Sequence, residues 1–466
     1  MQRARQGAVG CRYKPLLITI NAAKRPRGVT MTDSPGTGKN LLLPLILITS
    51  LFFLWGLANH LNDILLTQFK KVFSLTDLKA GLVQSAFYLG YFLLAIPAAL
   101  WMKRFGYRAG VVFGLLLYGL GALLFYPAAQ VREYSVFLMA LFVIASGLAF
   151  LETSANPLII AMGDPATAER RLNFAQSFNP LGAITGVLIG REFILSGNEP
   201  SAEELAAMSA SQLEQFYQAE SHAVQGPYMV LAAVVLCGAL LVWLARFPRV
   251  ATQPAVDGGA GSWSDYRWLL ANGRFMAGVM AQFFYVGAQV CIWAFMIRYG
   301  QEAMPGTGEK TLAVYVLASL VVFMLGRFVA TALMARVRAS WLMGVYAAIN
   351  MGLCAIALLW PSHSGLLALV ASCFFMSLMF PTIFALSVKG LGERTKAGSS
   401  LLIMAIVGGA VLSALMGWVS DLTSIHTALV VPLACFAVVA AYARSADRHL
   451  VAQQPVIQRR SMETSL

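Results

Sequence analysis

Long apolar blocks alternate with short polar loops along this sequence. Blocks of about 18 residues or more predict helices that span a bilayer. The runs 42–66 and 136–162 are long enough to span with some tilt. Charged and Gly/Pro-rich breaks divide the blocks into about twelve predicted spans, placed at 42–66, 78–101, 109–128, 134–162, 172–196, 225–247, 275–299, 311–335, 341–361, 365–389, 398–419 and 426–444.

This pattern predicts an all-α polytopic membrane protein with six spans on each side of a polar linker. We expect a basic cytoplasmic tail over 1–41, an N-terminal six-helix bundle over 42–247, a cytoplasmic linker over 248–274, a C-terminal six-helix bundle over 275–444 and a cytoplasmic tail over 445–466. Met31 is an alternative start, because 32–40 forms an ordinary polar lead into the first span. The halves show a weak likeness, since a basic cluster ends the second and the eighth span.

Composition excludes a soluble protein. Charged residues make up only 12% of the chain, whereas a soluble domain carries about a quarter. The net charge of +13 invites a nucleic-acid interpretation. We favour membrane topology instead, because the basic residues are dispersed among short loops and termini, and we expect no nucleic-acid partner.

Loop charges predict the orientation. Basic loops follow the second, eighth and tenth spans, and an acidic segment over 196–225 lies on the opposite side. Because lysine and arginine favour the cytoplasmic side, both termini are predicted to be cytoplasmic. One loop argues the other way, since Lys70, Lys71 and Lys79 would lie outside.

The sequence contains no grouping typical of catalysis or metal binding. Its six cysteines show no paired spacing, and five lie in apolar blocks, which favours packing over disulfides or metal ligands. We therefore expect no enzyme activity, no cofactor and no metal site.

Two carboxylates lie inside predicted spans, Asp63 in the first and Glu152 in the fourth. A charge at mid-membrane costs about 2.5–3.5 kcal/mol on insertion scales, so each needs a function or a partner. Neither has Lys or Arg three or four residues away. Both are predicted to take part in proton coupling, because a buried carboxylate can exchange protons near physiological pH. The alternatives are a sugar-hydroxyl acceptor, a pair with Arg327 in the eighth span, or a satisfied structural group.

Amides and aromatic residues accompany these acids at helical spacings. Amides both donate and accept hydrogen bonds, and ring faces cover sugar C–H surfaces, so the set suits an uncharged polyol. Interhelical hydrogen bonding is the alternative for any single amide. His60, three residues before Asp63, can also tune its titration. The predicted substrate residues are Trp55, Asn59, His60, Asn62, Glu152, Asn156, Gln176, Asn179, Gln282, Tyr285, Gln289 and Trp293, and Asn173 belongs to the same polar series.

Several motifs resemble the fucose permease group of the major facilitator superfamily. They cover about the region from Leu42 to Arg444. The matching segments are 59–65 (NHLNDIL), 84–91 (QSAFYLGY), 151–157 (LETSANP), 175–179 (AQSFN), 282–289 and 380–384 (FPTIF).

The resemblance implies a major facilitator fold and proton-coupled symport of a monosaccharide. It places the family's proton-coupling aspartate on Asp63 and its central-cavity glutamate on Glu152. The sugar-cavity amides would be Asn59, Gln176 and Asn179, and Trp293 would be an aromatic wall residue. The sequence departs from the family at three places: His60 replaces an asparagine, Met379-Phe380 replaces the Gln-Tyr of fucose carriers, and Lys103 replaces an acid in the basic motif.

We therefore predict a monomeric sugar–proton symporter of the bacterial inner membrane, with L-fucose favoured and glucose or galactose as the alternative. Its partners are a monosaccharide, protons and the lipid bilayer. A sugar-responsive membrane sensor is a different class, although the tail after Arg444 is short for a signalling domain. A drug–proton antiporter would have a more apolar cavity than this amide-rich set.

Overall fold

A computed structural model describes residues 42–72, 77–194, 207–252 and 263–463. Within these ranges, it describes the side chains at 42–61, 87–190, 192–194, 207–209, 211–248, 251–252, 263–308 and 311–448. The side chains of Asn62 and Asp63 and the tail over 1–41 therefore lie outside the described residues. Every regular element in the described ranges is helical.

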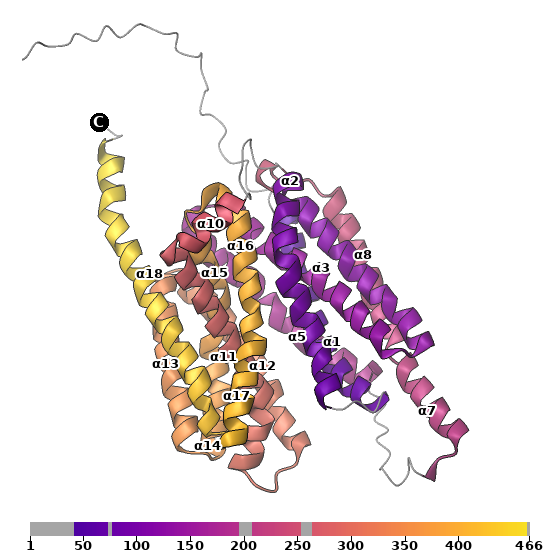
Figure 1. The fold of residues 1–466 in the computed structure, drawn as a ribbon. Coiled ribbons are helices and arrows are strands. Elements are labelled where there is room, and N and C mark those ends of the chain that lie inside the picture. The colour runs from indigo at the N-terminus through magenta and orange to yellow at the C-terminus, as the bar shows by residue number, and fades with distance from the viewer. Residues whose placement is uncertain (1–41, 73–76, 195–206, 253–262, 464–466) are drawn as a thin grey trace, which may run out of the picture. The chain divides into compact units, whose positions relative to one another are not determined.

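The N-terminal half and the start of the polar linker together contain eight α-helices in the described ranges, and Figure 1 shows the order of the chain by colour. They are α1 (Leu42–Val72), α2 (Asp77–Val131), α3 (Tyr134–Ala161), α4 (Ala168–Gln176), α5 (Phe178–Ile189), α7 (Ala210–His222), α8 (Gln225–Leu244) and the short α9 (Arg249–Thr252). A 3-10 turn, η1 (Pro165–Thr167), precedes α4, and a π-helical turn, η2 (Gly190–Ile194), follows α5.

The C-terminal half is built in the same way from long and interrupted helices (Figure 1). They are α10 (Trp263–Ala271), α11 (Gly273–Ala303), α12 (Glu309–Leu333), α13 (Ala339–Leu359), α14 (His363–Met376), α15 (Met379–Val388), α16 (Thr395–Met404), α17 (Gly408–Leu422) and α18 (Val430–Glu463). Three 3-10 turns lie between them, η3 (Gly392–Arg394), η4 (Ala405–Val407) and η5 (Thr427–Leu429).

The described helices account for the predicted spans. When helical segments separated by a short break are counted together, ten of them are long and apolar enough to cross a membrane. One of these, α2, is two helices joined at Gly106, whose φ of 82° lies in the left-handed region that favours glycine. The broken pair α4 and α5 supplies a further membrane-length element. The part of the chain that the structure describes thus contains about twelve spans, as expected for this length and hydropathy.

Two groups of helices pack mainly within themselves. Helices α1 to α8 form one group, here called the N bundle, and α11 to α18 form the other, here called the C bundle. Each has a closely packed apolar interior. The five cysteines of the described residues are free. The four in the C bundle (Cys291, Cys354, Cys373 and Cys435) are buried, as predicted for packing residues, whereas Cys237 in α8 is exposed and does not fit that prediction.

Helices α1 and α5 cross at van der Waals contact. A Cβ atom added to Gly56 would lie 1.9 Å from the carbonyl oxygen of Asn179, and one added to Gly182 would lie 1.9 Å from that of Phe53. Any larger residue would push the helices apart, so these positions require glycine. Gly182 and Gly186 form the small-residue pair typical of close helix contacts in membranes. This crossing sets the position of α5, which carries Asn179.

Candidate functional site

Glu152 lies in the middle of α3 and is buried, with 1% of its surface exposed. It makes no ion pair among the described side chains. Its neighbour is Tyr91 of α2, which interacts electrostatically with both Glu152 and Trp55 of α1. A buried carboxylate without a cation is costly, because burial removes the water that stabilises its charge. Its environment therefore fits a group that is protonated for part of its working cycle.

Several buried polar atoms of the N bundle, one of them on Glu152, have no aligned hydrogen-bond partner in the described structure. Buried polar atoms are nearly always paired in folded proteins, so a group of unpaired ones indicates a place for water or a ligand. The group includes both donors and acceptors, which is what a hydroxylated ligand needs. These atoms are Trp55 Nε1, Asn59 Oδ1, Tyr91 Oη, Glu152 Oε2 and Asn156 Nδ2.

The predicted amides of the N bundle are partly joined to one another. Gln176 Nε2, at the end of α4, donates to Asn156 Oδ1 at 3.0 Å. Asn179 Nδ2, at the start of α5, donates to the carbonyl oxygen of Phe52 at 3.3 Å. His60 Nδ1 lies 3.2 Å from the carbonyl oxygen of Gly56, so its ring bonds to its own helix.

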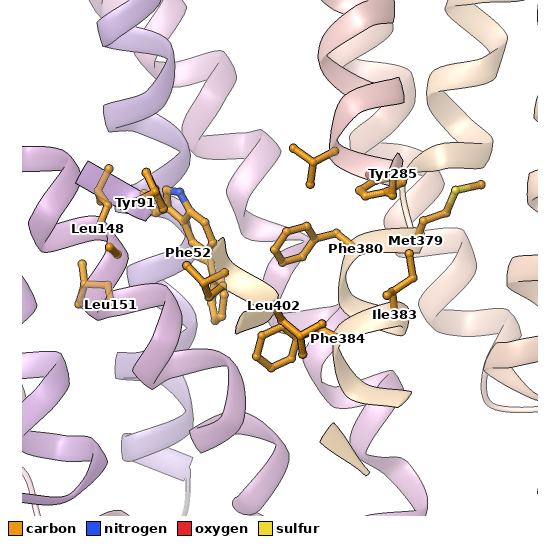
Figure 2. Packing of buried hydrophobic residues seen from close by; sticks show 14 of the residues in the cluster. Phe52, Tyr91, Leu148, Leu151, Tyr285, Met379, Phe380, Ile383, Phe384 and Leu402 are labelled. Atoms are coloured by element: carbon orange, nitrogen blue, oxygen red, sulfur yellow. The ribbon is translucent and has the colours of Figure 1, made fainter. Parts of the chain in front are cut away.

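The predicted C-bundle residues divide into two pairs along α11. Gln282 and Tyr285 are fully buried. The Gln282 amide has no hydrogen-bond partner among the described residues, and the Tyr285 hydroxyl interacts electrostatically with Arg327 of α12 without an aligned hydrogen bond. Figure 2 shows Tyr285 beside Phe380 and Met379 of α15, and the two ring centroids are 6.4 Å apart. Gln289 and Trp293 are half-buried.

Trp293 Nε1 donates to Ser319 Oγ of α12 at 3.1 Å. Its ring also makes an edge contact with Phe323, at 5.1 Å between centroids. The indole N–H of Trp293 is therefore already hydrogen-bonded within the C bundle. Only the face of its ring is available to line a sugar cavity, as the resemblance implies.

Arg327 of α12 is buried, with 4% of its surface exposed. Its Nε donates to the carbonyl oxygen of Ser377 at 2.7 Å, and its Nη1 donates to that of Gln176 at 2.5 Å. The guanidinium also lies 4.8 Å from the Phe323 ring centroid. No ion pair between Arg327 and Glu152 is formed among the described side chains, and the guanidinium donates to these two carbonyl groups instead.

The two bundles also meet at the end of the protein that carries the basic loops. This end, which includes Arg170, Arg171, Lys389, Arg394 and Lys396, is here called the basic end. Lys389 Nζ at the end of α15 lies 2.9 Å from Glu169 Oε1 in α4. Lys396 Nζ in α16 donates to the carbonyl oxygen of Met102 in α2 at 3.1 Å and lies 5.1 Å from the Tyr107 ring centroid. These contacts hold the bundles together at the basic end in this conformation.

Tyr91 and the donor role of Arg327 were not predicted from the sequence. Tyr91 belongs to the 84–91 motif, but a tyrosine in an apolar block is most often a packing residue. Arg327 is recognisable in the sequence as a charge within a span, but the sequence indicates only a carboxylate as its partner. The placement of Asn62 and Asp63 remains a sequence prediction, since their side chains lie outside the described residues.

The fold and the polar site define a transporter of the major facilitator type. The chain belongs to the Major Facilitator Superfamily, whose family model matches residues 45–413.

Two curated relatives and one solved structure make the likeness more specific. The L-fucose-proton symporter of Escherichia coli (strain K12) is 45% identical over 413 residues, covering 88% of this chain and 94% of that protein. A glucose/galactose transporter of Brucella abortus biovar 1 (strain 9-941) is 36% identical, covering 90% of this chain and 98% of that protein. A crystal structure of the transporter FucP in the outward conformation is similar with a TM-score of 0.81 at 44% identity, covering 87% of this chain and 99% of that one. These relatives are transporters rather than enzymes.

Proposed function

We propose that this chain is a proton-coupled monosaccharide symporter that works by alternating access, with L-fucose as its favoured sugar. The observation that carries the proposal is Glu152, which is buried without a cation in a bundle that also buries several donors and acceptors without aligned partners. The 45% identity to an L-fucose-proton symporter supports this assignment.

The two carboxylates have different roles in this proposal. Asp63, in the motif that resembles the family's coupling aspartate, carries the proton. Glu152 links sugar to proton, because it lies one helical turn before Asn156, which in turn accepts from Gln176. Protonation outside makes the loaded carrier neutral and able to reorient, and release follows on the less acidic side. Because sugar and proton favour the same conformations, the proton gradient drives sugar uptake.

The sugar contacts are proposed to come from both bundles. Trp55, Asn59, Asn156, Gln176 and Asn179 supply them from the N bundle. Asn62 and His60 belong to the same set from the sequence pattern. From the C bundle come Gln282, Tyr285, Gln289 and the ring face of Trp293.

Glucose or galactose is the second candidate substrate. The observation that favours it is the apolar pair Met379-Phe380, which the structure buries beside Tyr285 in place of the Gln-Tyr expected of fucose carriers. Phe380 lacks the hydroxyl group of the tyrosine expected of fucose carriers, so one polar contact with the sugar is absent. Contacts of this kind discriminate strongly between sugars that differ by one hydroxyl group.

We further propose that the protein is a monomer in the bacterial inner membrane with both termini in the cytoplasm. The basic end, with Arg170, Arg171, Lys389, Arg394 and Lys396, would then face the cytoplasm. In that orientation the conformation described here is closed on the cytoplasmic side.

Purified protein in sealed vesicles, with a pH-sensitive dye inside, tests coupling and sugar identity together. We expect L-fucose added outside to move protons inward, with glucose and galactose giving smaller responses. Sugar uptake without proton movement would refute symport. Sugar binding without uptake would favour the sensor, and proton release coupled to apolar drugs would favour the antiporter.

A further inference from the structure

Arg327 bonds to two carbonyl groups that share an unusual sequence position. Gln176 lies four residues before Pro180, and Ser377 lies four residues before Pro381. In an α-helix the carbonyl group of a residue accepts from the N–H four residues later, and proline has no N–H. Each proline therefore leaves one carbonyl oxygen without its helical donor, and Arg327 supplies the donor to both.

The helices are interrupted at these same places. Helix α4 ends at Gln176 and α5 begins at Phe178, while α14 ends at Met376 and α15 begins at Met379. Gln176 belongs to the N bundle, whereas Ser377 and Arg327 belong to the C bundle. The bond to Gln176 therefore crosses between the bundles, and the bond to Ser377 stays within one.

Further bonds hold the same junction. Asn173 Nδ2, one turn before Gln176, donates to the carbonyl oxygen of Arg327 at 3.2 Å and to Thr331 Oγ1 at 2.7 Å. A buried arginine fixed by carbonyl dipoles loses much stabilisation when one acceptor leaves, because charge-assisted hydrogen bonds are stronger than neutral ones. Separation of the bundles at the basic end would break the Gln176 bond and expose both groups.

We propose that Arg327 is a positioning residue that latches the bundles closed through the carbonyl oxygen freed by Pro180. The latch also holds the main chain of Gln176, whose side chain bonds to Asn156 beside Glu152. Closure of the basic end is thereby tied to the position of a sugar-site amide. The role in sugar transport rests on the proposed function, whereas the latch itself does not.

The proline variants test the latch without altering any polar side chain. Pro180→Ala restores an N–H that bonds to the Gln176 carbonyl oxygen within the helix, so Arg327 loses its cross-bundle acceptor. Pro381→Ala makes the same chemical change within the C bundle and is the matched control. Arg327→Lys keeps the charge, but one ammonium group cannot reproduce the planar fork that reaches both carbonyl oxygens.

Spin labels measure the outcome directly. Val131 and Leu422 lie at helix ends of the N bundle and the C bundle, and their side chains are 62% and 65% exposed. Among the described residues Cys237 is an exposed cysteine, so it is replaced first to keep the label from reacting there. Distances between labels at 131 and 422 report the balance of conformations with no sugar and no gradient. We expect Pro180→Ala and Arg327→Lys to lower the ratio of molecules closed at the basic end to molecules open there by about tenfold or more, as loss of one charge-assisted hydrogen bond implies.

Pro381→Ala should change that ratio less than about twofold, because no bond between the bundles is touched. Equal shifts in both proline variants, or no shift with Pro180→Ala, would overturn the latch. Failure of the sugar–proton proposal would instead appear only in the vesicle assay, which leaves the distance measurement intact.

Discussion

The side-chain amide of Gln176 donates to Asn156 Oδ1 at 3.0 Å, and Asn156 lies one helical turn after Glu152. This bond joins the end of α4 to the middle of α3. It leaves Asn156 Nδ2 unpaired among the described residues, as a donor beside the carboxylate. A sugar hydroxyl bound there would contact the amide pair and Glu152 together, which provides a short physical link between sugar occupancy and proton occupancy.

Glu152→Gln keeps the size of the side chain and removes its charge and its exchangeable proton. We expect sugar-dependent proton uptake to fall more than tenfold and sugar binding to weaken, because the acceptor becomes an amide. Dye-loaded vesicles measure uptake, and calorimetry measures binding. Glu393→Gln in the exposed η3 turn is the control and should leave both unchanged. Binding and transport unchanged in Glu152→Gln would remove Glu152 from the site.

Asp63→Asn should abolish uphill, proton-driven accumulation of sugar while some sugar exchange between equal pools remains. The physical reason is that exchange needs the carrier to reorient with sugar, whereas accumulation needs a proton to be carried with it. Radiolabelled sugar uptake with and without a pH gradient separates the two. Asp421→Asn, a change at an exposed aspartate of α17, serves as the control. Full accumulation by Asp63→Asn would contradict the proton role.

Tyr91→Phe removes the hydroxyl group beside Glu152 and keeps the ring. We expect coupled uptake to fall by about threefold to tenfold, since one hydrogen-bonding group is worth about 1 kcal/mol. Tyr299→Phe is matched in chemistry, because the Tyr299 hydroxyl is buried and donates to the carbonyl oxygen of Ala357 away from Glu152. An equal loss of uptake in both variants would mean that the effect of Tyr91 is one of general stability.

The ion pair between Glu169 and Lys389 is predicted to favour closure of the basic end. Glu169→Gln or Lys389→Gln should each reduce the ratio of closed to open molecules by up to about fivefold, because the pair is partly exposed. Reversing both charges, with Glu169→Lys and Lys389→Glu together, should restore it. The spin-label distances described above measure the change.

The pair between Arg298 and Asp421 is the control for this reversal, since it is exposed and lies within the C bundle. Its reversal should leave the distances as in the wild type. A double reversal at Glu169 and Lys389 that shifts the population as far as the single changes would show that the ion pair has no conformational role.

The spans and the site helices were predictable because each rests on a local signal. Span length follows from runs of apolar residues, and the amides at 156, 176 and 179 follow from polar positions within such runs. The interruptions at Ser177 and Ser377 were not predicted, although Pro180 and Pro381 mark them, because a proline in a membrane helix also fits a kink. The partners of Arg327 and Trp293 depend on helices distant in the sequence, so no local pattern reveals them.

The contact of Gly56 with Asn179 has a mechanical consequence. Helices α1 and α5 touch through their main chains, so no side chain lies between them to deform when one of them shifts. The helix that bears the proposed proton carrier and the helix that bears a proposed sugar amide are therefore coupled by direct main-chain contact at this crossing. If the proposed protonation of Asp63 shifts α1, the shift should reach Asn179 directly, because the two main chains are in contact at this crossing.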